Sequence, residues 1–139
     1  MTAQFNEILN SVKESENISL ENKKNILIID DNNDVVNSLS IVLNGTYNLI
    51  LCKSFEEVKS KFNPDIKVCL LDIKMANLNG IDLFPLLKTN YPNLNIIFHS
   101  AYPGNESLVE RINSLPHSGY LTKGDYNITE LLQTINNAF

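Results

Sequence analysis

Cysteine is scarce in this chain, and its two cysteines lie where neither a disulfide nor a zinc site is expected. Cys52 and Cys69 both fall inside apolar runs of strand type, without CxxC spacing and without a histidine at metal-ligand spacing. We therefore interpret both as reduced thiols of a hydrophobic core.

Long apolar runs and an excess of positive charge are also missing. No run approaches the roughly 18 apolar residues that a membrane span requires, and residues 1–7 lack the basic start and apolar stretch of a signal peptide. The formal net charge of -5 argues against nonspecific binding of nucleic acid by this segment alone. We therefore expect a cytoplasmic protein that contacts neither membrane nor nucleic acid directly.

The chain has 139 residues, without an internal repeat or low-complexity tract, which suits one domain with its own core. Its first residues differ from the rest. Apolar side chains recur there at helical spacing, and a polar, charged stretch follows: Phe5, Ile8, Leu9 and Val12, then 15–24. We predict an amphipathic helix and linker over 1–24 and a folded domain over 25–139. Whether this helix packs loosely, docks onto a partner or dimerises stays open.

Short apolar runs alternate with amphipathic stretches from residue 25 onward. The apolar runs predict five buried strands at 25–29, 47–52, 68–72, 95–100 and 119–123. Apolar residues at helical spacing predict five helices around 35–43, 55–62, 81–87, 108–115 and 128–135. This alternation predicts an α/β fold in which helices cover both faces of a parallel sheet.

Polar residues gather at the carboxyl ends of these strands. They are Asp30 and Asp31 after the first, Asp72 after the third, Ser100 on the fourth and Lys123 on the fifth. Because the carboxyl ends of parallel strands share one edge, these groups should face one crevice. Two like charges about 4 Å apart cost on the order of 4 kcal/mol at an effective dielectric near 20. A cation or a proton must therefore lie among the carboxylates.

A magnesium ion suits this set, because a few carboxylates completed by water are typical of Mg²⁺ rather than of a calcium cage. A metal ion, a hydroxyl and an ammonium around one carboxylate can hold a phosphoryl group while Asp72 attacks phosphorus to form an acyl phosphate. Each residue alone could equally be a helix cap, a turn hydroxyl or a solvated side chain. Their joint placement favours the phosphoryl site.

At these positions the chain resembles the receiver domains of two-component response regulators, which are CheY-like. The resemblance covers about 25–139 and is carried by Asp30-Asp31, Asp72 with Met75 and Gly80, Ser100-Ala101, and the run Gly119-Tyr120-Leu121-Thr122-Lys123. It implies a flavodoxin-like (βα)5 three-layer sandwich with five parallel strands in the order 2-1-3-4-5.

The resemblance also implies a role for each residue of the site. Asp72 would be phosphorylated, and Ser100 and Lys123 would act with it in catalysis by bonding phosphoryl oxygens. Mg²⁺ would be held directly by Asp31 and Asp72, through water by Asp30 and through its backbone carbonyl by Lys74.

A switch is implied as well. Tyr120 would turn inward as Ser100 moves, so that the new charge on Asp72 alters the surface formed by the helix around 108–115, the strand 119–123 and the last helix. Lys74 and Tyr102 stand where the family tunes dephosphorylation. Ala76 and Gly124 depart from the family's pattern, because proline is frequent at both positions.

A histidine kinase or histidine phosphotransferase is the implied phosphoryl donor, and a downstream protein or an output domain outside this chain is the implied receiver of the signal. A homodimer could form through the switching surface or through the N-terminal helix. We expect self-phosphorylation and autodephosphorylation only, not conventional turnover. His99 and His117 have no partner at catalytic or metal spacing, and we interpret both as structural.

Three other functions stay open. A receiver-like interaction module could bind its partner without being phosphorylated. A flavodoxin-type electron carrier would share the architecture, but the acidic stretch 30–34 would repel a flavin phosphate. A metal phosphatase could use the same acids, although the lysine and hydroxyl favour a single self-turnover.

Overall fold

Five strands and five helices alternate along the part of the chain that the computed structural model describes, which is residues 23–76, 79–101 and 103–139. The elements are β1 (Lys24–Ile29), α2 (Asn33–Leu43), β2 (Tyr47–Cys52), α3 (Phe55–Lys61), β3 (Ile66–Leu71), α4 (Gly80–Asn90), β4 (Asn95–Ser100), α5 (Glu106–Ser114), β5 (Gly119–Thr122) and α6 (Ile128–Asn137). Residues 1–22 of the predicted helix and linker, and Tyr102, lie outside the described residues.

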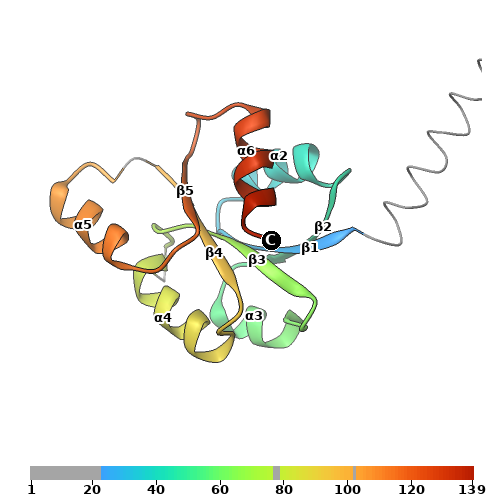
Figure 1. The fold of residues 1–139 in the computed structure, drawn as a ribbon, viewed down its shortest axis with the longest axis horizontal. Coiled ribbons are helices and arrows are strands. Elements are labelled where there is room, and N and C mark those ends of the chain that lie inside the picture. Colours follow the sequence, from blue (N-terminus) through green and yellow to red (C-terminus); the bar gives the residue numbers. More distant parts are fainter. Residues whose placement is uncertain (1–22, 77–78, 102) are drawn as a thin grey trace, which may run out of the picture.

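The strands form one parallel sheet in the order β2-β1-β3-β4-β5. Helices α2 and α6 cover one face, and α3, α4 and α5 cover the other (Figure 1). The predicted three-layer sandwich and its strand order are therefore confirmed. The strand limits differ slightly from the prediction: β3 begins two residues earlier, at Ile66, and β5 ends at Thr122, one residue before Lys123.

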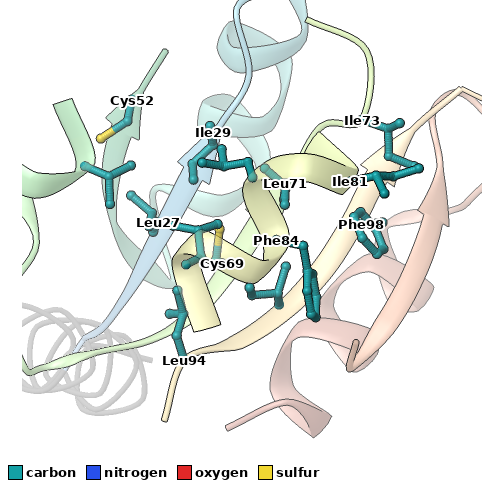
Figure 2. Close-up of a cluster of buried hydrophobic side chains, with 14 of the residues drawn as sticks. Leu27, Ile29, Cys52, Cys69, Leu71, Ile73, Ile81, Phe84, Leu94 and Phe98 are labelled. Atoms are coloured by element: carbon teal, nitrogen blue, oxygen red, sulfur yellow. The ribbon is translucent and has the colours of Figure 1, made fainter. Parts of the chain in front are cut away.

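The three central strands are buried on both faces, as their continuous apolar runs predict. In β3 every residue except Lys67 is buried, and in β4 every residue except Asn95. Cys52 and Cys69 are buried free thiols, which confirms their interpretation as core residues, and Figure 2 shows both among apolar side chains of the α3–α4–α5 face. Burial raises the pKa of the Cys69 thiol well above its ordinary value, so this thiol stays protonated.

Asparagine side chains begin the two helices that follow the acidic strand ends. The side chain of Asn32 accepts hydrogen bonds from the backbone N–H groups of Asp34 and Val35 at the start of α2. The side chain of Asn79 accepts one from Ile81 N–H at the start of α4. Both caps satisfy backbone donors that the first turn of a helix leaves free. None of the described helices combines the length and apolar character needed to cross a bilayer.

Gly80 allows the start of α4 to approach the end of β3 closely. Its N–H donates to the carbonyl of Ile73 at 2.8 Å. A Cβ added at residue 80 would overlap the carbonyl oxygen of Asp72 and would lie 2.9 Å from the Cα of Ile73. These neighbours are backbone atoms, which cannot turn aside as a flexible side chain can. The helix therefore approaches the main chain of Asp72 this closely only because residue 80 has no side chain.

We predict that Gly80→Ala destabilises the fold by about 1–3 kcal/mol, because the added methyl forces α4 away from the main chain of Asp72. Urea unfolding followed by circular dichroism measures this loss. Gly45→Ala is the matched control, since an added Cβ there meets nothing within 4 Å, and its effect should stay within about 0.5 kcal/mol. Equal losses in the two variants would contradict the close-approach explanation.

Candidate functional site

The carboxyl edge of the sheet brings together four of the predicted site residues. Asp30 follows β1, Asp72 follows β3, Ser100 ends β4 and Lys123 follows β5. Backbone hydrogen bonds continue the sheet ladder beyond the strands: Asp30 N–H donates to Cys52, Asp72 N–H to Ile29, and Lys123 N–H to Ser100, at 3.2, 3.0 and 2.9 Å. The main chain at each residue is thus fixed before its side chain makes any contact.

Two side chains contact the carboxylate of Asp72 directly. The hydroxyl of Ser100 donates to Asp72 Oδ1 at 2.9 Å, and the ammonium of Lys123 lies 3.3 Å from Asp72 Oδ2. Lys123 also lies 2.9 Å from Asp30 Oδ2, so one ammonium joins two carboxylates. Asp30, Asp72 and Ser100 are only 2%, 3% and 3% exposed, which makes these contacts stronger than the same contacts in water.

Asp31 completes a group of three carboxylates. Asp30, Asp31 and Asp72 each offer one oxygen, and these oxygens lie within 4.8 Å of one another. The other partners of this group are main-chain donors: Ala76 N–H donates to Asp31 Oδ2 at 2.7 Å and Asn32 N–H to Asp30 Oδ1 at 2.9 Å. Asp31 therefore also ties the loop after β3 to the end of β1.

The group fits a hard divalent cation. Asp30 Oδ2 is buried and accepts no hydrogen bond of good geometry from the described residues. Its neighbour is the Lys123 ammonium, 2.9 Å away, with which it forms an ion pair. Three carboxylates against one ammonium leave excess negative charge, which suits Mg²⁺ held by carboxylates and water.

Lys74 lies in the loop that leaves this group. Its side chain is exposed, and residue 74 forms an isolated antiparallel bridge with Asn79, immediately before α4. The bridge joins the beginning of the loop after Asp72 to the start of α4. The role of the Lys74 carbonyl as a metal ligand stays a prediction.

The pKa values of the acid and of the base of this site are both raised, for different physical reasons. Burial raises the pKa of Asp72, and the charge of Asp30 adds to the rise, although the Ser100 hydrogen bond and Lys123 oppose it. Burial alone would lower the pKa of Lys123, but its contacts with Asp30 and Asp72 outweigh burial and raise it. Lys123 is therefore a permanent cation at neutral pH.

Tyr120 connects β5 to the segment that follows Ser100. Its hydroxyl donates to the carbonyl oxygen of Ala101 at 2.6 Å, and its ring lies 6.3 Å, between centroids, from that of Phe98. The half-buried ring thus reaches the residue directly after Ser100. This contact supports a link between the two residues, and the movement implied by the resemblance stays a prediction.

Sequence reasoning missed one polar pair beside the site. Nε2 of His99 lies 2.8 Å from the hydroxyl oxygen of Tyr126. The two residues are 27 positions apart, so no local spacing relates them. The available signal was a histidine directly after three apolar strand residues, which sequence reasoning interpreted as structural.

Comparison with known proteins gives consistent matches. The family model described as response regulator receiver domain matches residues 26–136. The transcriptional regulatory protein DegU of Brevibacillus brevis is 31% identical over 109 residues, covering 74% of this chain and 45% of that protein. The DNA-binding transcriptional regulator NtrC of Proteus hauseri is 28% identical over 122 residues, covering 84% and 24%. The chain thus spans less than half the length of either relative.

A solved structure matches over most of both chains. The CheY-like response regulator receiver domain protein from Methanospirillum hungatei is 25% identical, with a TM-score of 0.69, and the match covers 83% of this chain and 92% of that one.

We predict that Asp72→Asn raises the free energy of unfolding of the metal-free protein at neutral pH. The raised pKa of Asp72 means that folding disfavours its charged form. The variant removes this penalty, and an asparagine oxygen can still accept from Ser100. The gain should be absent well below pH 3.8, where the carboxyl is protonated in both states, and should grow as the pH rises through the folded-state pKa.

Urea unfolding in EDTA across this pH range measures the difference. Asp65→Asn removes an exposed acid at the opposite end of β3 and should change stability by less than about 0.5 kcal/mol. A variant at position 72 that is less stable than the wild type at neutral pH would contradict the prediction.

Proposed function

The chain belongs to the family of response regulator receiver domains, and from this premise we propose that Asp72 accepts a phosphoryl group, in a Mg²⁺-dependent reaction, from a histidine kinase or a histidine phosphotransferase. The observation that supports this most is the arrangement of donors around Asp72. A hydroxyl approaches one of its oxygens and an ammonium the other, beside two more carboxylates. A carboxylate with this surrounding can act as a nucleophile toward phosphorus.

In the proposed reaction a carboxylate oxygen of Asp72 forms a bond to phosphorus. The bond from phosphorus to the donor's imidazole nitrogen breaks, and its electron pair returns to the ring. Ser100 and Lys123 would transfer their contacts from the Asp72 oxygens to the phosphoryl oxygens, so that no donor is left without an acceptor. Mg²⁺, held by Asp31, Asp72 and the Lys74 carbonyl, and by Asp30 through water, would neutralise phosphoryl charge.

The signal would leave the site through Ser100 and Tyr120. The hydroxyl of Tyr120 donates a hydrogen bond to the carbonyl of Ala101, next to Ser100. A movement of Ser100 toward the phosphoryl group would therefore change the hydrogen bond and the packing of the Tyr120 ring. The surface formed by α5, β5 and α6 would then change and act on a downstream protein, on an output domain outside this chain, or on a second copy of the chain. Lys74 and Tyr102 would tune the lifetime of the acyl phosphate, and its hydrolysis would end the signal.

We predict that acetyl phosphate with Mg²⁺ phosphorylates the wild type and that Asp72→Asn abolishes the product. Intact-mass spectrometry measures the adduct. Asp65→Asn, at the opposite edge of the sheet, should be phosphorylated like the wild type. An adduct that persists in Asp72→Asn would place the acceptor elsewhere. A wild type that gains none would favour an interaction module that is not phosphorylated.

We further predict that Mg²⁺ binds the unphosphorylated wild type and that Asp31→Asn weakens this binding about tenfold or more, because a neutral amide replaces one of three clustered carboxylates. Isothermal titration calorimetry measures the affinity. Asp34→Asn removes an exposed acid in the first turn of α2 and should change the affinity less than twofold. Equal losses in both variants would mean that general charge, not ligation, holds the ion.

A further inference from the structure

His99 and Tyr126 form a polar contact on the apolar α2–α6 side of the sheet. His99 is the penultimate residue of β4 and only 3% exposed. Its Nε2 lies 2.8 Å from the Tyr126 hydroxyl oxygen, and the two ring centroids are 5.6 Å apart. Tyr126 directly precedes Asn127, the residue that caps α6. The pair therefore connects the end of β4 to the start of α6.

This contact is a polar feature of an apolar part of the core. The core on this side is otherwise built from apolar side chains such as Ile97 and Leu121. An aliphatic residue at position 99 would fill the same face without removing a polar ring from water. Burial, assisted by the charge of Lys123, lowers the pKa of His99 to about 4, so the imidazole is neutral at neutral pH and forms no ion pair.

The pair stands at one end of the turn that carries Lys123. Asp125 N–H donates to the carbonyl of Thr122 at 3.0 Å, and Gly124 has a φ of 77°, as the third residue of a type II turn does. A Cβ added at Gly124 would meet nothing within 4 Å. The side of the turn on which this Cβ would project is thus open space.

A cavity lies against the same turn. Its volume is about 380 Å³, and its lining includes His99, Lys123, Gly124 and Tyr126 together with Val35 and Leu39 of α2. Beside an open cavity, the turn is fixed at its two ends. Lys123 N–H donates to Ser100 at the first end, and Tyr126 contacts His99 at the second.

We propose that the His99–Tyr126 hydrogen bond positions the Lys123 ammonium between Asp30 and Asp72. We call this contact the His99–Tyr126 tether, and both members are positioning residues that act through Lys123. Without it the turn can shift into the cavity, and Lys123 Nζ then loses its simultaneous approach to the two carboxylates, now 2.9 and 3.3 Å away. The consequence for phosphoryl binding rests on the function proposed above, whereas the effect on Lys123 does not.

The first test compares two affinities of Tyr126→Phe, which loses only the hydroxyl. Beryllofluoride with Mg²⁺ probes the phosphoryl position that Lys123 would contact, and Mg²⁺ alone probes the acids. We expect beryllofluoride affinity to fall about three- to tenfold, as for the loss of one buried hydrogen bond, and Mg²⁺ affinity to change less than twofold. Equal losses of both affinities, or no loss of either, would overturn the proposal.

Matched variants separate the hydrogen bond from the bulk of the side chains. Tyr91→Phe removes the same hydroxyl from a ring that stacks on Phe62 and should bind both probes like the wild type. His99→Val should reproduce Tyr126→Phe. His99→Gln, whose amide can still bond the Tyr126 hydroxyl, should recover most of the loss. A glutamine variant no better than the valine variant counts against the tether.

A double-mutant cycle tests whether the effect passes through Lys123. In the Lys123→Ala background, Tyr126→Phe should weaken beryllofluoride binding by less than a further twofold. An undiminished effect there would show that Tyr126 acts by another route, and the proposal would fail.

The final measurement needs no phosphoryl chemistry. In the metal-free protein the ¹³Cγ resonance of Asp30 reports its contact with Lys123. Tyr126→Phe should move this resonance toward its position in Lys123→Ala, and Tyr91→Phe should not. An Asp30 resonance that is unchanged in Tyr126→Phe overturns the tether. If the wild type binds no beryllofluoride, the proposed function fails, and this resonance still decides the tether.

Discussion

Mutual repulsion of carboxylates at one edge of the sheet is the constraint around which the structure is arranged. Asp30 and Asp72 cannot move apart, because the ladder hydrogen bonds that continue β1 and β3 fix their main chains. Lys123 relieves part of the repulsion by contacting both. Asp31 is the third carboxylate of this group. It accepts a hydrogen bond from the N–H of Ala76, and the two ion pairs of Lys123 are with Asp30 and Asp72 instead. The remaining negative charge would favour a cation at this edge.

The apolar strands beneath supply the stability that such an edge requires. β1, β3 and β4 are nearly continuous runs of buried aliphatic and aromatic side chains, so their burial offsets the unfavourable charge at their ends. The same strands leave little freedom to their last residues. A site that stores repulsion in this way is less stable than it could be, which is a common property of functional sites. Gly80 is a second example, because the absence of a side chain there lets α4 pack on the main chain of Asp72.

The sequence was sufficient for the parts of the site that strand ends determine. Asp30, Asp72, Ser100 and Lys123 could be placed together because parallel strands end at one edge, and the resemblance supplied the strand order. Contacts that involve a loop residue were not predictable in this way. The hydrogen bond from Ala76 to Asp31 spans 45 positions, and that between His99 and Tyr126 spans 27. In neither pair does the type of one residue indicate which residue it will contact. Such pairs depend on how loops fold over the sheet, which no local pattern encodes.

Gly124 shows how one of these contacts bears on the departure from the family's pattern. The sequence suggested only that glycine removes the restraint of a proline after Lys123. The structure gives a stronger reason, because φ at Gly124 is 77° and a proline ring holds φ near -65°. The turn therefore has a different shape and is not a looser version of a proline turn. A turn of this shape, with open space beside Gly124, can be held in place by a contact outside itself. The hydroxyl of Tyr126 on the ring of His99 provides a contact of that kind, at the one place where the chain leaves Lys123 and enters α6.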